Sequence, residues 1–204
     1  DVYKRQVAVC SHGVGAPGAA VVFEELIAAG AKTIIRIGTC GGLQPELAAG
    51  QLVVARAAVD NTGYGPQTVP AGYPAVADPG LTLRLHQEAS QITGRRVTAG
   101  IVLTRDNFYR GVDLPHLVNY EIMTQAKVLA VEMECSALFM IGTLRQILTG
   151  AILVVDGNLV AAGKEEMDTY QPHREQVRSG VKMAIQAALQ TIDSLAGEQA
   201  NEPG

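Results

Sequence analysis

The chain has 204 residues, enough for one domain with a sizeable core and few for two. Its 16 basic and 20 acidic residues give a net charge of −4, which disfavours nucleic acid and membrane surfaces as partners and favours small anionic or neutral ligands. Three cysteines without Cys-x-x-Cys spacing argue against a disulfide framework and a zinc site. No apolar run reaches the roughly 20 residues of a membrane span, and the N-terminus does not resemble a signal peptide. We expect a single cytoplasmic domain over residues 7–196.

The two ends of the chain differ in composition from this domain. Residues 1–6, DVYKRQ, place Asp1, Lys4 and Arg5 where a first strand should begin. We interpret this segment as a non-native or junction segment that replaces an earlier part of the natural chain. Residues 197–204, GEQANEPG, are expected to form a disordered tail.

Apolar and amphipathic runs alternate along the chain. Most strand-like runs are too apolar to have a face in water, which indicates a central sheet covered by helices. The pattern predicts strands at 6–10, 32–37, 51–59, 96–103, 128–133 and 150–155, and helices at 17–29, 79–93, 116–126, 134–147 and 173–196. This alternation predicts an α/β fold. The long loops at 60–78 and 104–115 are candidates for functional segments.

Residues 11–18, SHGVGAPG, contain glycines at the spacing G-x-G-x-x-G, between a strand-like run and a helical run. This spacing is typical of a dinucleotide-binding loop. That motif also needs an acidic residue about 20 positions further on, at the end of the next strand, to hold the ribose hydroxyls. No Asp or Glu lies between Glu25 and Glu46, so we expect a ligand smaller than a dinucleotide.

Arg36 lies within the apolar run KTIIRIG and is followed by the glycine cluster GTCGG at 38–42. Because a guanidinium does not lose its charge, a buried one needs an anion or a carboxylate. Two interpretations remain open. Free backbone N–H groups of the glycine-rich segments favour a site for a small anion. The alternative is an internal ion pair between Arg36 and an acid such as Glu134.

Glu132 and Glu134 interrupt the largely apolar segment VLAVEMECSALFMIGTL at 128–144. Residues two apart on a strand point to the same face, so both carboxylates are expected to face one way. Together with Met133 they are typical of a sugar site at the carboxyl end of a strand. The alternative is that the glutamates cap the first turn of the helix that follows.

Other candidate residues are less specific. Asp156 ends the strand-like run AILVVDG, where ligands bind in open α/β sheets, although an Asp-Gly turn has the same sequence. Phe108 and Tyr109, in the loop RDNFYRG, are able to stack on a flat ring or to plug the loop. The four histidines have no metal-ligand spacing, so we expect no metal site. Neither a G-x-S-x-G nor a P-loop sequence occurs, which disfavours an esterase or an NTPase.

Four motifs occur in a specific order: SHGVGAPG, EELIAAGAKTIIRIGTCGGLQP, VEMECSALFMIGTL and ILVVDG. Together they resemble the nucleoside phosphorylase family, which contains hexameric purine nucleoside phosphorylases and uridine phosphorylases. The resemblance extends from residue 7 to about residue 195 and is closest to purine nucleoside phosphorylases of the apicomplexan type. It implies three layers, α/β/α, with a mixed, mostly parallel twisted sheet.

The resemblance also implies an activity, the phosphorolysis of purine nucleosides to the free base and ribose 1-phosphate. Inorganic phosphate is then a co-substrate, and no cofactor or metal is expected. Asp156 and Arg36 are the implied catalytic residues, with Asp156 protonating the base as the glycosidic bond breaks. The implied binding residues are Arg36, Gly38 and Thr39 for phosphate, Val14, Met133 and Glu134 for ribose, and Phe108, Tyr109, Val131 and Glu132 for the base.

Departures from the family pattern bear on the substrate and on assembly. Uridine phosphorylases have a Gln and an Arg where this chain has VDLPHL after Gly111, which favours a purine. Thr39 and Gly18 stand where purine members often have Ser, which points the other way. The family also has a G-D-P-G-R phosphate segment before residue 7 and takes a His and an Arg from a neighbouring subunit. We therefore expect a homo-oligomer based on dimers, up to a hexamer, when that segment is present. The alternatives are a uridine phosphorylase and an inactive nucleoside-binding module.

Overall fold

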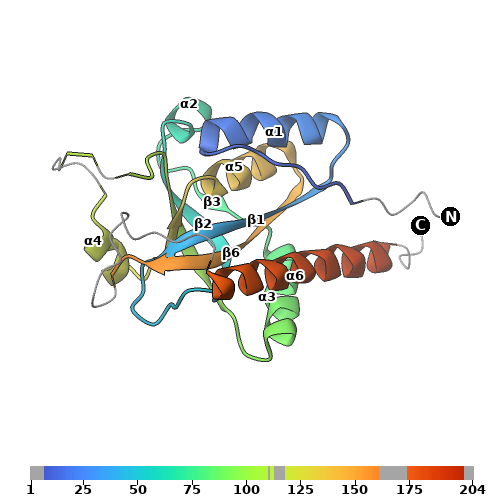
Figure 1. The fold of residues 1–204 in the computed structure, drawn as a ribbon. Coiled ribbons are helices and arrows are strands. Elements are labelled where there is room, and N and C mark those ends of the chain that lie inside the picture. The colour runs from blue at the N-terminus through green and yellow to red at the C-terminus, as the bar shows by residue number, and fades with distance from the viewer. Residues whose placement is uncertain (1–6, 110, 113–117, 161–173, 200–204) are drawn as a thin grey trace.

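The computed structural model describes residues 7–109, 111–112, 118–160 and 174–199 (Figure 1). Its six strands are β1 (Thr33–Gly42), β2 (Leu52–Asn61), β3 (Ala75–Val76), β4 (Thr98–Arg105), β5 (Ala130–Glu132) and β6 (Leu148–Asn158). Its helices are α1 (Ala16–Ala28), α2 (Gly65–Thr68), α3 (Pro79–Thr93), α4 (Tyr120–Gln125), α5 (Cys135–Arg145) and α6 (Glu175–Gln199). The predicted α/β class is confirmed.

Local sequence explains where the main helices begin and end. Pro17 lies in the first turn of α1, where its missing N–H has no cost, and Gly30 follows the helix at φ 102°. In α3, the Asp78 carboxylate accepts a hydrogen bond from the Leu81 N–H at 2.7 Å, and Gly94 ends the helix in the left-handed conformation. These boundaries depend on short-range signals, and the sequence predicts them to within one or two residues.

The strands form one mixed sheet, in the order β3-β2-β4-β5-β1-β6. The pairs β1–β6, β2–β4 and β4–β5 are parallel, whereas β1–β5, β2–β6 and β2–β3 are antiparallel. Because β6 pairs with β2 as well as with β1, five strands close into a ring, and β3 extends it from β2. The sheet is mixed, as predicted. Its closure was not predicted, because the β2–β6 pairing joins two strands that are far apart in the sequence.

Helices cover the strands from two sides (Figure 1). The α1 and α5 helices pack together over one side, and their core includes Phe23 and Phe139. The α3 and α6 helices pack together over the other side, around Leu81 and Leu85. All residues of α5 from Cys135 to Gly142 are buried, so this helix is held firmly against the strands. Among the described residues, no helix is both long and apolar enough to cross a bilayer.

Two predictions about the ends of the domain are wrong. Residues 7–10 form no strand, and Val9 is 94% exposed. These residues are exposed and do not pair with β1, although β5 occupies that edge of β1 only at Gly41 and Gly42. An apolar run gives a strand propensity but does not by itself determine a partner strand. Residues 197–199, expected in a disordered tail, belong to α6. Residues 1–6 and 200–204 lie outside the described residues.

We expect Phe139→Ala to lower the free energy of unfolding by about 3–5 kcal/mol, because it removes a fully buried ring from the core beneath α5. Leu144→Ala on the same helix is the control: this side chain is 44% exposed, so its loss should cost below about 1 kcal/mol. Urea denaturation measures both. Equal losses in the two variants would contradict the placement of α5.

Candidate active site

Arg36, on β1, is held by two carboxylates, from the end of β5 and from the residue directly before α5. Its Nη2 donates to Glu134 Oε2, and its Nη1 lies 3.4 Å from Glu132 Oε2. All three residues are buried, with 6%, 4% and 4% of their surface exposed. The expectation that both glutamates face one way is confirmed, because they converge on one guanidinium. The internal ion pair considered for Arg36 is therefore present.

Glu132 is fixed by hydrogen bonds to both of its carboxylate oxygens. Its Oε1 accepts from the Thr104 hydroxyl, and its Oε2 accepts from the backbone N–H groups of Glu134 at 2.8 Å and Cys135 at 2.9 Å. These N–H groups open α5 and have no partners within the helix. Glu132 therefore has the capping role that was the alternative for this pair, and the helix dipole favours its negative charge there.

Glu134 contacts the glycine-rich loop instead. Its Oε1 accepts a hydrogen bond of 2.7 Å from the Gly15 N–H. Gly13 and Gly15 have φ values of 75° and 87°, which side chains other than glycine rarely adopt. The glycine spacing therefore shapes a loop whose backbone reaches the carboxylate of the VEME motif, across 119 positions in the sequence.

The missing side chain of Gly38 leaves space for the guanidinium of Arg36. A Cβ added at Gly38 would lie 2.7–2.8 Å from the terminal atoms of Arg36, so only glycine leaves room for the side chain to fold back along β1. Among the described residues, Arg36 Nε is a buried donor without an acceptor. Thr39 is exposed at the next position of the strand. The guanidinium group thus keeps one nitrogen, Nε, whose N–H has no acceptor among the described residues.

Burial and charge together determine the protonation of this cluster. Burial disfavours the charged guanidinium, but the negative charges of Glu132 and Glu134 offset this, and the pKa of Arg36 is raised. Burial, with the charges of Asp156 and Glu132, raises the pKa of the Cys40 thiol well above its usual value. Burial and Glu132 do the same to the pKa of the Cys135 thiol. Both cysteines are therefore neutral neighbours of an ionic site.

Asp156 lies on β6 near this cluster and is 7% exposed. The strands pair Cys40 with Val155 and Gly41 with Gly157, so Asp156 is skipped and sits at an irregularity in the register. A bulge of this kind redirects a side chain and is frequent next to active sites. The charges of Asp156 and Glu132 both raise the pKa of the Cys40 thiol, so both carboxylates lie near it. The predicted proton donor, Asp156, and the Arg36 cluster therefore lie in one region.

Other predicted residues lie at the surface. The exposed fractions of Phe108, Tyr109 and Val14 are 44%, 74% and 79%. The two aromatic rings contact each other edge to face, with their centroids 5.2 Å apart, so Tyr109 does not plug its loop. Val131 is buried and Met133 partly buried, on either side of Glu132. The roles of these five residues in binding ribose or base stay predictions.

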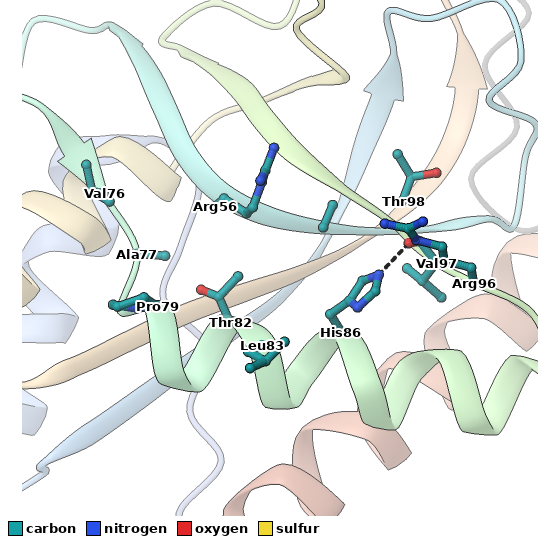
Figure 2. Close-up of a pocket in the computed structure, with 11 residues that line it drawn as sticks. Arg56, Val76, Ala77, Pro79, Thr82, Leu83, His86, Arg96, Val97 and Thr98 are labelled. Atoms are coloured by element: carbon teal, nitrogen blue, oxygen red, sulfur yellow. Dashed lines mark hydrogen bonds between the residues drawn. The ribbon is translucent and has the colours of Figure 1, made fainter.

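A groove of about 710 Å³ lies between α3 and the strands β2, β3 and β4, and Figure 2 shows its lining. Arg56 of β2 and Arg96, which precedes β4, are among its lining residues, and His86 of α3 is hydrogen-bonded to the Val97 carbonyl oxygen at 2.8 Å. It shares no residue with the Arg36 cluster.

No set of three or more His, Cys, Asp or Glu residues is grouped to hold a metal ion within the ranges that the structure describes.

Sequence reasoning missed Thr104, Ser136 and Asp60, which link the cluster to neighbouring strands. Thr104 and Asp60 directly follow the predicted strands 96–103 and 51–59. Polar residues at the carboxyl ends of neighbouring strands meet at one edge of a sheet, so this position was an available signal. Which strands are neighbours, however, is not readable from their local sequences.

Residues 2–193 match the sequence family described as the phosphorylase superfamily. The chain belongs to this family. Uridine phosphorylase of Treponema pallidum is 36% identical over 200 residues, which cover 92% of this chain and 75% of the relative. Purine nucleoside phosphorylase of Plasmodium falciparum (isolate 3D7) is 38% identical over 188 residues, covering 91% and 75%. The sequence resemblance to nucleoside phosphorylases is thereby confirmed.

A solved structure agrees with this family assignment. The crystal structure of purine nucleoside phosphorylase from Toxoplasma gondii, in complex with immucillin-H, superimposes with a TM-score of 0.82 at 33% identity. The match covers 92% of this chain and 73% of that chain. This likeness supports the α/β arrangement described above, with helices and a mixed sheet.

We expect one of the three thiols to react with a thiol reagent in the folded protein at about pH 8, and all three after denaturation. Cys10 is exposed, whereas the raised pKa values of Cys40 and Cys135 keep these buried thiols protonated.

The same two thiols make stability depend on pH. In the unfolded chain, Cys40 and Cys135 ionise near pH 8.5, whereas in the folded protein they stay protonated at that pH. The free energy of unfolding should therefore fall as the pH rises above about 8.5.

Titration with a chromogenic disulfide, before and after denaturation, counts the reactive thiols. Cys10→Ser should abolish the reaction of the folded protein. Rapid reaction of either remaining thiol in the folded Cys10→Ser variant would show that the cluster is open to solvent, against the burial described here.

Proposed function

We propose that this protein catalyses the phosphorolysis of purine nucleosides, yielding the free base and ribose 1-phosphate. The observation that carries the proposal is the buried guanidinium of Arg36, which has one unpaired donor and lies against Glu134, close to Asp156. Membership of the phosphorylase superfamily supports it. Inorganic phosphate is the co-substrate, and the proposal requires no cofactor.

The reaction has electrostatic demands that these residue types meet. Breaking the glycosidic bond leaves positive charge on the sugar and negative charge on the base. Phosphate places an anion beside the sugar, and Arg36 binds it as a planar fork with Gly38 and Thr39 next to it. Glu134 binds the sugar hydroxyls, and Asp156 gives a proton to the departing base.

The choice of base is argued from the sequence after Gly111 and from Thr39. The relatives include a uridine phosphorylase at 36% identity and a purine nucleoside phosphorylase at 38% identity, which do not separate the two substrates. The absence of Gln and Arg after Gly111 favours a purine, and Thr39 disfavours it. Tyr109 and Phe108 are proposed to stack on the base, with Val131 and Glu132 beside it and Val14 and Met133 near the ribose.

An inactive nucleoside-binding protein is the second candidate, and one observation favours it. Both terminal nitrogens of Arg36 already face carboxylates, so the guanidinium is neutralised without phosphate. Incubation with inosine and then with uridine, each with and without phosphate, distinguishes the candidates. Phosphate-dependent release of free base supports the enzyme. Absence of turnover together with thermal stabilisation by nucleoside would support the binding protein.

Assembly is a further part of the proposal. Apolar side chains near the N-terminal end are exposed, including Val9 and Val21. Such side chains would lose contact with water if a partner subunit covered them. We propose at least a homodimer, and sedimentation equilibrium tests this; a monomer at micromolar concentrations would contradict it.

Asp156→Asn is expected to lower kcat on purine nucleosides by roughly 10²–10⁴-fold, since it removes a general acid, and to change nucleoside affinity by far less. Steady-state kinetics with inosine, and calorimetric titration of inosine, measure the two effects. Asp193→Asn, on the exposed side of α6, is the control and should leave both unchanged. Equal losses in turnover and affinity at Asp156 would argue against its role as a proton donor.

A further inference from the structure

Three neighbouring strands end at the site with a polar residue at the same level of the sheet. The strand register places Asp60 of β2 opposite Thr104 of β4, and Thr104 opposite Glu132 of β5. Thr104 is completely buried, as is Ser136 in the first turn of α5. This row leads from the interior of the sheet directly to the carboxylate that contacts Arg36.

Two hydroxyls, of Thr104 and Ser136, connect the members of this row. Thr104 Oγ1 donates to Glu132 Oε1 and accepts from the Ser136 N–H at 2.9 Å. The Ser136 hydroxyl in turn donates to Asp60 Oδ1 at 2.7 Å. Because a threonine hydroxyl has only one proton, and the N–H of Ser136 is itself a donor, that proton is directed at Glu132.

These bonds make the two carboxylates on Arg36 unequal. Glu132 has donors on both oxygens, so its rotation would leave a buried donor without a partner. Glu134 is held outside the cluster by the Gly15 N–H, which belongs to a loop rather than to the sheet. Glu132 is therefore the partner of Arg36 that is anchored to the sheet and to the first turn of α5, and it faces Nη1, while Glu134 accepts the hydrogen bond from Nη2.

We propose that Thr104 is a positioning residue for phosphate binding. Through its bond to Glu132 it fixes the direction in which Arg36 presents its donors to phosphate, although Thr104 itself does not contact the substrate. This inference rests on the proposed function. Without the hydroxyl, Glu132 would be held only through Oε2, the oxygen that faces Arg36 Nη1, and the carboxylate would be able to pivot about that oxygen.

A matched control distinguishes a positioning role of Thr104 from a contribution to stability alone. Thr191 of α6 is also completely buried, and its hydroxyl donates to the Ala187 carbonyl oxygen at 2.8 Å. Thr191→Val therefore removes a buried hydroxyl of equal size on the far side of the strands. Destabilisation alone should affect both variants, whereas loss of phosphate affinity should be confined to position 104.

The experiment is a calorimetric titration of inorganic phosphate, combined with KM and kcat measurements on inosine and phosphate. Thr104→Val should weaken phosphate binding roughly ten- to a hundredfold and raise the KM for phosphate by a similar factor. Thr104→Ser, which retains the hydroxyl, should remain within about threefold of the parent, a difference below about 1 kcal/mol. Thr191→Val should bind phosphate as the parent does.

Unchanged phosphate affinity in Thr104→Val, or equal weakening in Thr104→Ser or Thr191→Val, overturns the inference. Should Thr104→Val not fold, Thr104→Ala against Thr104→Ser provides the same contrast in the hydroxyl, since both lack the methyl group. A parent protein that neither binds phosphate nor releases base refutes the proposed function and this inference with it. An active parent with an unaffected Thr104→Val refutes the inference alone.

Discussion

The ion pairs of one buried guanidinium organise this structure. Arg36 lies within a strand that is covered on both sides, where an unpaired charge would cost several kcal/mol. Glu132 and Glu134 neutralise it from the adjoining strand and helix. The requirement to bring these three residues together explains the other local features: glycine at 38, positive φ angles in the glycine-rich loop, and an acidic residue at the start of α5.

The same arrangement connects the fold to its proposed chemistry. The two glutamates lie between β5 and α5, a helix buried along most of its length: Glu132 ends the strand and Glu134 directly precedes the helix. A register irregularity on β6 brings Asp156 into the same region. Binding groups that are fixed by packing and hydrogen bonds need little rearrangement when a ligand arrives, which is the general basis of electrostatic preorganisation. The sheet thus orients the charged side chains of the site as well as forming the core.

Local patterns predicted most of the elements, and they failed where distant segments decide the outcome. The α1 and α3 boundaries follow from Pro17, Gly30, Asp78 and Gly94, which act within one turn. Residues 7–10 are apolar enough for a strand, yet they are exposed and pair with none of the described strands. The convergence of Glu132 and Glu134 follows from their spacing, whereas the link through Thr104 depends on the order β2-β4-β5. No local sequence encodes that order.

A crystal structure with phosphate and a non-hydrolysable purine nucleoside analogue tests the central claim most directly. The account predicts phosphate oxygens within hydrogen-bond distance of the Arg36 guanidinium, with Glu132 still bonded to Thr104 and Glu134 on the sugar hydroxyls. Ligands bound elsewhere, with Arg36 still bonded only to the two glutamates, would contradict it.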